Sequence, residues 1–325
     1  MDPLSDVFML LKVESVLSVR LEGAGPWALR FPAYRHVKFG GVIEGARWLW
    51  IDGSSERVKL DAGDFYLLTD GRPYCFASDP AAPLQDGSRI MRDHLSDDGI
   101  VRYGSGTPKT VGAGGRFVFD EEISRWLLEL LPALIVIRHA SPQARALQPA
   151  LDLIRLETEA VRPGAVAIAA SLASIVLVNI LRAHLAGDAP PTGWLGALAD
   201  PKIGKALRLM HGDVTRRWKV ADLAALVGMS RTSFSERFRE RVGLPPLEYL
   251  TGWRMTIARH ALKFESDALA KIAMKIGYES ETAFSLAFKR IFGESPGQYR
   301  ARVRAAAPTP MGSDESQSYT LGIEA

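Results

Sequence analysis

Short runs of apolar residues, separated by turn residues, fill the first third of the chain. Two examples are Arg47–Ile51 and Phe65–Leu68, each followed within two residues by an Asp-Gly pair. Aromatic and aliphatic runs of this length that end at Asp-Gly turns are typical of strands in an antiparallel sheet. The pattern predicts an antiparallel β-barrel or sandwich over residues 13–119.

The spacing of apolar residues changes from about residue 121, where it follows the period of a helix. We expect helices over residues 121–187, and a linker over 188–199 because the segment that opens it is rich in Pro and Gly. A second, all-α domain is predicted over residues 200–304. The polar tail, 305–325, has little to bury and is predicted to be disordered. The chain as a whole is therefore expected to be of the α+β class.

One uncharged stretch, Gly164–Leu181, approaches the length of a membrane span. It consists largely of Ala, Ser and Gly and is interrupted by Asn179, which favours a buried or subunit-packing helix over a membrane helix. The N-terminal residues lack the apolar core of a signal peptide, and the single cysteine, Cys75, cannot form an internal disulfide. We therefore expect a cytoplasmic protein without membrane association.

Charge is divided unevenly between the two predicted domains. Residues 1–199 carry 20 Lys and Arg against 23 Asp and Glu, whereas residues 200–304 carry 20 against 11. A compact basic segment is typical of a module that neutralises phosphates, although a solvated basic surface would have the same composition.

Residues 220–304 contain one pattern twice. In each copy, a pair of apolar residues and a Gly come first, then two Phe residues spaced i, i+4, and finally Gly, Pro and Tyr. The two copies lie about 50 residues apart. Gly228 and Gly277 stand where a left-handed residue would end a first helix, and Ser230 and Ser280 where an N-cap would begin a second. The pattern predicts two helix-turn-helix units, at about 220–241 and 269–292.

The repeated units and the closing Gly293–Arg300 segment resemble the C-terminal DNA-binding domain of AraC/XylS-type transcriptional regulators. The resemblance implies that the second helix of each unit enters the major groove of double-stranded DNA. It places six side chains at base edges, namely Thr232, Ser235, Glu236, Glu281, Thr282 and Ser285. Five cations are candidates for phosphate contacts, although each would equally suit an ordinary exposed helix position, namely Arg231, Arg239, Arg254, Lys289 and Arg290. Leu286 replaces a polar residue here, which favours contacts with thymine methyl groups and sensitivity to DNA shape.

The N-terminal half resembles the cupin-like sensor domain of one AraC subgroup, on the residues Asp2–Asp6, Gly25–Trp27 and Leu60–Asp64 and the later Gly193–Pro201. The resemblance implies a domain over residues 1–187 that binds a small-molecule effector and dimerises. The candidate pocket residues are the aromatic and polar side chains Trp27, Arg30, His36, Trp48, Trp50, Tyr66 and Tyr74. Each of them would equally suit the core of a domain that binds no ligand.

A cupin fold also raises the alternative of a cupin-type enzyme fused to a DNA-binding domain. The six His residues are scattered, no His-x-His pair exists, and Cys75 has no adjacent base. We therefore expect no catalytic residue, no metal and no cofactor. The expected function is a sequence-specific DNA-binding regulator that forms a homodimer through helices at 147–159 and 165–185. An effector is expected to change either its operator occupancy or its contact with RNA polymerase.

Overall fold

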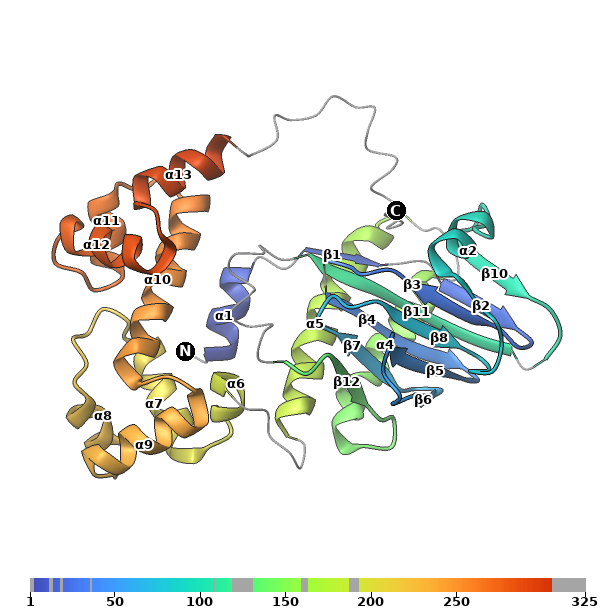
Figure 1. Cartoon of the computed structure of the whole chain (residues 1–325), viewed down its shortest axis with the longest axis horizontal. Helices are drawn as coiled ribbons and strands as arrows, with labels where there is room; N and C mark the ends of the chain where they lie inside the picture. The colour runs from blue at the N-terminus through green and yellow to red at the C-terminus, as the bar shows by residue number, and fades with distance from the viewer. Residues whose placement is uncertain are drawn as a thin grey trace. The chain divides into compact units, whose positions relative to one another are not determined.

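The computed structural model describes residues 3–11, 14–17, 20–35, 37–107, 109–118, 131–158, 163–186 and 193–305. Their contacts divide them into two units. The sandwich unit consists of the described residues between 14 and 118 and between 131 and 186. The helical unit consists of Pro3–Leu11 and residues 193–305 (Figure 1).

Two β-sheets make up most of the sandwich unit. The larger sheet has the strand order β10-β2-β11-β4-β7-β12, with β1 paired to β11, and the smaller has the order β6-β5-β8-β3-β9. All pairs are antiparallel except β10 with β2 and β3 with β9. The strands are β1 (Glu14–Leu17), β2 (Arg20–Ala24), β3 (Ala28–Phe31), β4 (Val37–Glu44), β5 (Ala46–Ile51), β6 (Val58–Asp61), β7 (Phe65–Leu68), β8 (Tyr74–Ala77), β9 (Leu84–Asp86), β10 (Ile100–Gly104), β11 (Lys109–Val118) and β12 (Leu134–Ile137).

The apolar core of this unit lies between the two sheets. Alternate residues of facing strands, among them Leu29, Leu49, Leu68 and Phe76, are buried there. The other face of the larger sheet buries Phe39 against Phe117 and is covered by helices. The helical segments of the unit are α2 (Gly87–Asp93), the 3-10 turn η1 (Pro142–Ala146), α4 (Gln148–Thr158) and α5 (Ala165–Leu185).

The helical unit is built around two short helix pairs joined by one long helix. Its elements are α1 (Pro3–Leu11), α6 (Gly193–Ala197), α7 (Pro201–Gly212), α8 (Val220–Leu226), α9 (Arg231–Val242), α10 (Pro246–Phe264), α11 (Leu269–Lys275), α12 (Glu281–Phe292) and α13 (Pro296–Ala305). The two helix pairs are α8 with α9 and α11 with α12, and α10 connects them.

Three segments differ from the sequence-based division of the chain. Leu134–Ile137, in a region predicted to be helical, pairs with β7, because four consecutive apolar and mostly β-branched residues extend the sheet. Gly193–Ala197, predicted as part of the linker, forms the helix α6. This helix packs against α9, and its Trp194 and Leu195 side chains are buried. Pro3–Leu11, predicted in the sensor domain, packs against α7 in the helical unit.

Some sequence-based expectations fall outside the described part of the chain. These are the predicted helix at 121–130, the Pro- and Gly-rich start of the linker at 187–192, His36, and the tail from 306 onward. The uncharged stretch weighed as a membrane span is part of α5. Among the helices that the structure describes, α5 included, we find none whose length and apolar character would let it cross a membrane.

Candidate functional site

Each helix pair has the local chemistry of a helix-turn-helix unit. Ser230 caps α9 by accepting a hydrogen bond from the Ser233 amide at 3.2 Å, and Ser280 caps α12 through the Ala283 amide at 3.1 Å. The turns before these caps contain Gly228 at φ +67° and Gly277 at φ +80°, a left-handed conformation that a residue without Cβ adopts without strain. The predicted turn glycines and N-caps are confirmed.

Two fully buried Phe residues hold each second helix against the rest of its unit. Phe234 and Phe238 do so for α9, and Phe284 and Phe288 for α12. Their i, i+4 spacing uses one face of the helix and leaves the opposite face to solvent. The sequence-predicted base-contacting residues lie on these free faces. Thr232, Glu236, Glu281 and Thr282 are exposed, and Ser235 and Ser285 are half-buried.

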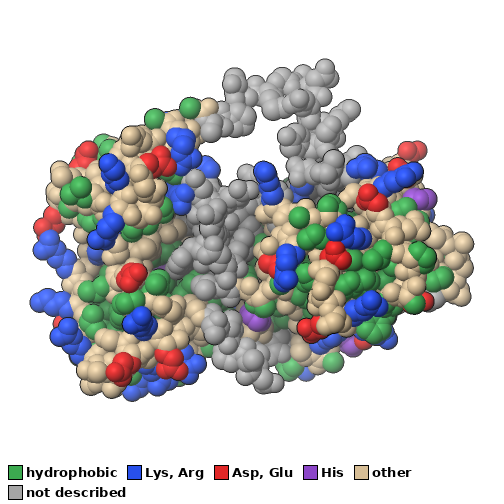
Figure 2. Space-filling model, viewed as in Figure 1, with side chains coloured by type: hydrophobic (Ala, Val, Ile, Leu, Met, Phe, Trp, Pro, Cys, Tyr) green, Lys and Arg blue, Asp and Glu red, His purple; other side chains and the backbone are tan. Residues whose placement is uncertain are grey.

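Four of the predicted phosphate-contacting cations surround the same faces. Arg231, Arg239, Lys289 and Arg290 are all exposed. Figure 2 shows Lys and Arg side chains, in blue, along the outer edge of the helical unit where these helices lie. Leu286, also on α12, is 68% exposed, which no packing role explains.

Arg254, the fifth predicted cation, has a different place. From α10 its Nε donates to the Val214 carbonyl at 2.8 Å and its Nη2 to the Arg216 carbonyl at 2.9 Å. Burial holds the pKa of this guanidinium below its ordinary value. Because two of its three nitrogens are occupied by backbone oxygens, Arg254 is placed to hold the loop before α8.

The same loop meets the turn of the second helix pair. Arg217 forms an ion pair with Glu279 at 2.5 Å, and a Cβ at Gly277 would overlap the Thr215 carbonyl oxygen. These contacts join the loop that precedes α8 to the turn between α11 and α12. The two helix-turn-helix units are therefore connected both by α10 and by a second bridge at this loop.

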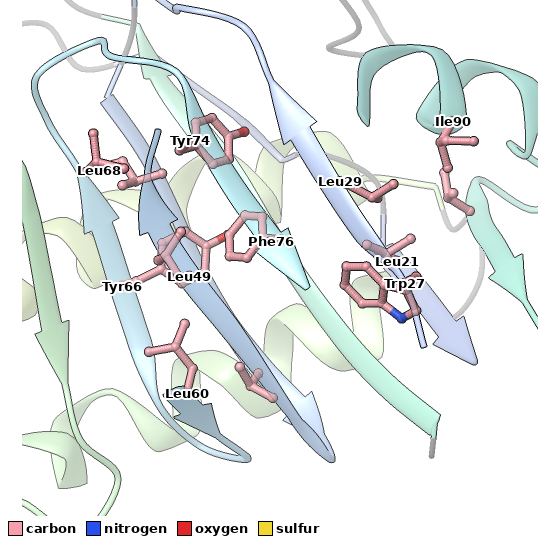
Figure 3. Close-up of a cluster of buried hydrophobic side chains, with 13 residues drawn as sticks. Leu21, Trp27, Leu29, Leu49, Leu60, Tyr66, Leu68, Tyr74, Phe76 and Ile90 are labelled. Atoms are coloured by element: carbon pink, nitrogen blue, oxygen red, sulfur yellow. The ribbon is translucent and has the colours of Figure 1, made fainter. Parts of the chain in front are cut away.

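The predicted effector-pocket residues of the sandwich unit separate onto two faces. Trp27, Tyr66 and Tyr74 are buried between the sheets, where Figure 3 shows them with Phe76. Burial raises the pKa of Tyr66 to about 12, so its hydroxyl is neutral at physiological pH. Trp48 and Trp50 are on the opposite face of β5 together with Cys75. Leu49 and Ile51 face the interior, as the strand period predicts.

Arg30 also lies outside the sandwich interior. Its side chain is half-exposed, pairs with Asp52 at 2.8 Å and lines a surface groove of about 380 Å³ with Arg92. Cys75 is fully buried, and burial raises the pKa of its thiol to about 11. Across the described ranges, no three His, Cys, Asp or Glu side chains come close enough to share a metal ion.

One interior polar residue was missed by the sequence analysis. Arg47 of β5 is only 4% exposed and its guanidinium lies 5.8 Å from the centre of the Phe76 ring. The signal was present, because Arg47 is in phase with Leu49 and Ile51 along the strand and so shares their inward face. A basic residue at a core position calls for a functional explanation.

Comparison with known proteins gives the same two-part organisation. Residues 2–186 match a family described as cupin, and residues 223–302 match one described as a helix-turn-helix domain. A protein of Streptomyces lividans described as an AraC-like transcription regulator is 43% identical over 303 residues, which are 92% of this chain and 98% of the relative. The HTH-type transcriptional regulator AlkR of Acinetobacter baylyi is 32% identical, over 92% of this chain and 99% of the relative.

Among solved structures, the DNA-binding domain of AdpA in complex with a target DNA is 31% identical to this chain. The matched region covers 34% of this chain and 97% of the AdpA chain, with a TM-score of 0.32. The cupin match extends over more than half of the chain, and the two relatives above are matched over nearly their whole length. The chain therefore belongs to the family of AraC-like transcriptional regulators, with a cupin domain followed by a helix-turn-helix domain.

Proposed function

We propose that this regulator inserts α9 and α12 into successive major grooves of one DNA site. The observation that carries the proposal is the matched construction of the two helices. Each begins at a serine N-cap, buries a Phe pair at i, i+4 and leaves a polar face free. Two such helices on one body can reach grooves about 34 Å apart.

Within this proposal the exposed residues divide by chemistry. Thr232, Ser235 and Glu236 of α9, and Glu281, Thr282 and Ser285 of α12, contact base edges. Glutamate accepts from cytosine N4, and serine or threonine can bond several bases. Arg231, Arg239, Lys289 and Arg290 neutralise phosphates, which positions the protein without selecting sequence. Arg254 contributes by positioning, since its Nε and Nη2 hold the loop between α7 and α8.

The sandwich unit supplies effector sensing and dimerisation in this proposal. Exposed apolar side chains support the helices α4 and α5 as the dimer surface, namely Leu153, Leu156, Ile168 and Ile175. Dimerisation makes the second half-site contact intramolecular and so raises affinity without new contacts. Effector binding between the sheets would then change operator occupancy or contact with RNA polymerase.

A selection on sheared genomic DNA tests the DNA-binding part. The full chain is equilibrated with fragments at low and near-physiological salt, and the recovered fragments are sequenced and footprinted. We expect a few discrete sites that survive the higher salt, with protection over successive helical turns. Uniform recovery that disappears at the higher salt would contradict sequence-specific binding.

Variants separate the two kinds of contact at a recovered site. Arg231→Ala and Lys289→Ala should each lower affinity on all sequences and reduce the slope of log K against log salt by about 0.9 for one phosphate lost. Glu236→Ala and Thr282→Ala should change base preference at single positions and leave the slope unchanged. Lys205→Ala, an exposed cation on α7, is the matched control and should change neither quantity.

A further inference from the structure

The interior of the sandwich holds a cation that has two nitrogens without a hydrogen-bond partner among the described residues. Arg47 extends from β5 between the two sheets, and its Nε and Nη2 atoms are buried without a hydrogen-bond partner among the described residues. Its guanidinium lies over the face of the Phe76 ring and against Gly112. In the part of the chain that the structure describes, no carboxylate pairs with it.

Two further orphan polar atoms lie along the same inner surface. The Trp27 Nε1 and the Thr110 Oγ1 are buried and unbonded within the described ranges. Gly23, which pairs with Thr110 across β2 and β11, packs under the Trp27 indole, and Gly112, two residues after Thr110, packs under the Arg47 guanidinium. Thr110 therefore lies between the indole and the guanidinium, with its side chain on the face that Gly112 shares.

The larger sheet is shaped to receive these groups. A Cβ at Gly112 would overlap the guanidinium of Arg47, one at Gly23 the indole of Trp27, and one at Gly40 the hydroxyl of Tyr66. These glycines come from the neighbouring strands β2, β11 and β4. The absence of side chains at these positions is what allows the polar ends of the larger side chains to lie inside the sandwich.

A buried guanidinium without an anion is unfavourable, because both its charge and its N–H groups have been removed from water. Nε and Nη2 form one edge of the guanidinium plane, and their N–H groups can donate together to a carboxylate that approaches side-on. The same chain uses this edge elsewhere, since Arg237 donates to the Asp200 carboxylate through Nε at 2.9 Å and Nη2 at 2.7 Å. The edge that Arg237 uses for a carboxylate is the edge of Arg47 that has no partner among the described residues.

We propose that the sandwich interior binds a small organic acid whose single carboxylate docks on the Nε and Nη2 edge of Arg47. One buried positive charge matches a monoanion, whereas a dianion would leave a net charge in the core. The surrounding Phe76, Val42 and Leu21 side chains favour an apolar body on the acid. The unused Trp27 N–H is a donor for a second oxygen. This inference rests on the proposed function only in that the acid would be the effector.

Thermal unfolding of the full chain tests the site with chosen probes. Propionate and phenylacetate are compared with propionamide and phenylacetamide, at constant ionic strength balanced with chloride. The acids should raise Tm and the amides should not, because each amide keeps the shape of its acid and lacks the charge. Arg47→Met keeps the length of the side chain and should reduce the apparent affinity for the acids at least tenfold. Arg57→Met, an exposed arginine over the outer face of Trp50, should respond like the unmodified chain.

A purely structural role for Arg47 predicts a different result. Arg47→Met would then melt well below the parent chain, whereas removal of an unpaired buried charge should leave Tm equal or higher. Should Arg47→Met not fold, Gly112→Ala provides the second variant, because its methyl group displaces the guanidinium while the charge remains, and it too should weaken the acid response. Equal responses to acids and amides, or an unchanged response in a folded variant, would overturn the proposal.

DNA binding is measured on the same samples so that the two proposals fail separately. Arg47→Met without any acid should bind the recovered DNA site like the parent chain. Loss of the acid response with intact DNA binding supports the anion site. A parent chain that binds acids through Arg47 but no specific DNA would leave this site standing and contradict the proposed function.

Discussion

The Asp6 carboxylate lies 3.4 Å from Nδ1 of His211, and both side chains are buried. Nε2 of His211 shares a hydrogen bond of 2.8 Å with the Tyr249 hydroxyl. The His211 ring also stacks on Trp253, with 4.3 Å between the ring centres. The N-terminal helix α1 is thereby joined to α7 and α10 of the helical unit. A residue from the start of the chain is thus part of the core that supports the helix-turn-helix units.

Shortening the apolar face of α1 should loosen α7. Leu4 is 5% exposed and Leu4→Ala should remove about 2 to 4 kcal/mol of packing free energy at this contact. Amide hydrogen exchange of α7 peptides should accelerate in this variant. Met9→Ala, at a position 63% exposed on the same helix, is the control and should leave exchange unchanged. Equal protection of α7 in both variants would contradict the contact.

Arg254 should act on DNA affinity through geometry rather than charge. Arg254→Ala releases the Val214 and Arg216 carbonyls and should lower affinity for a site contacted by both recognition helices. The slope of log K against log salt should stay the same, because no phosphate contact is lost. Arg231→Ala is the comparison, with its expected decrease in slope. A decrease of about 0.9 in the Arg254→Ala slope would instead place this guanidinium at a phosphate.

Charge on α4 and α5 should prevent dimerisation. Leu153 and Ile175 are 44% and 49% exposed, so Leu153→Glu and Ile175→Glu place carboxylates on the proposed subunit surface without disturbing the core. Sedimentation should show a shift from dimer to monomer, with reduced affinity for DNA that carries two half-sites. Leu84→Glu, at an exposed position on β9, should leave the sedimentation unchanged. A variant that sediments like the parent chain would remove these helices from the interface.

Acid should weaken the attachment of α9 to α7 through Asp200. Burial alone would raise the pKa of this carboxyl group, but the amides of Ile203 and Lys202 and the Arg237 guanidinium outweigh it and hold the pKa below its ordinary value. A lowered folded-state pKa means that the stabilisation is complete above the unfolded value of about 3.9 and is lost as pH falls through the folded value.

Asp200→Asn tests this dependence. Asparagine can still cap α7, so the variant removes mainly the ion pair. Urea unfolding at neutral pH should show a loss of about 1 to 2 kcal/mol, since Arg237 remains partly exposed. The difference between the two chains should decrease below about pH 4. A difference that stays constant from pH 7 to pH 3 would show that the charge of Asp200 does not contribute.

The Cys75 thiol should be unreactive in the native protein. It is fully buried, and burial followed by the nearby Asp52 charge raises its pKa to about 11. Very little thiolate is then present at pH 8, and thiolate is the reactive form. Labelling by iodoacetamide at pH 8 should be slow until denaturant is added. Rapid labelling of the folded chain would contradict the burial of this thiol.

Much of the helix-turn-helix construction could be predicted from sequence because its determinants are local. The Ser230 and Ser280 caps, the left-handed Gly228 and Gly277, and the Phe pairs act over three to five residues, and the repeat displays each signal twice. The strand from residue 46 to 51 was similarly recognisable, together with the opposite faces of Trp48 and Leu49. A local pattern can also be misleading, as Leu134–Ile137 shows. A short apolar run does not reveal whether a strand elsewhere in the chain is available to pair with it.

By itself, the sequence determined where the two helix-turn-helix units begin and end, and which of their faces stay polar, since hydrogen bonds and packing within one helical turn decide both. Only the tertiary structure decided that Arg254 binds backbone oxygens, that Asp6 meets His211, and that Arg47 lies between two sheets without a partner among the described residues. Each of these depends on partners far away in the chain. Such pairings follow from how whole sheets and helices pack, and no short window of sequence contains that information.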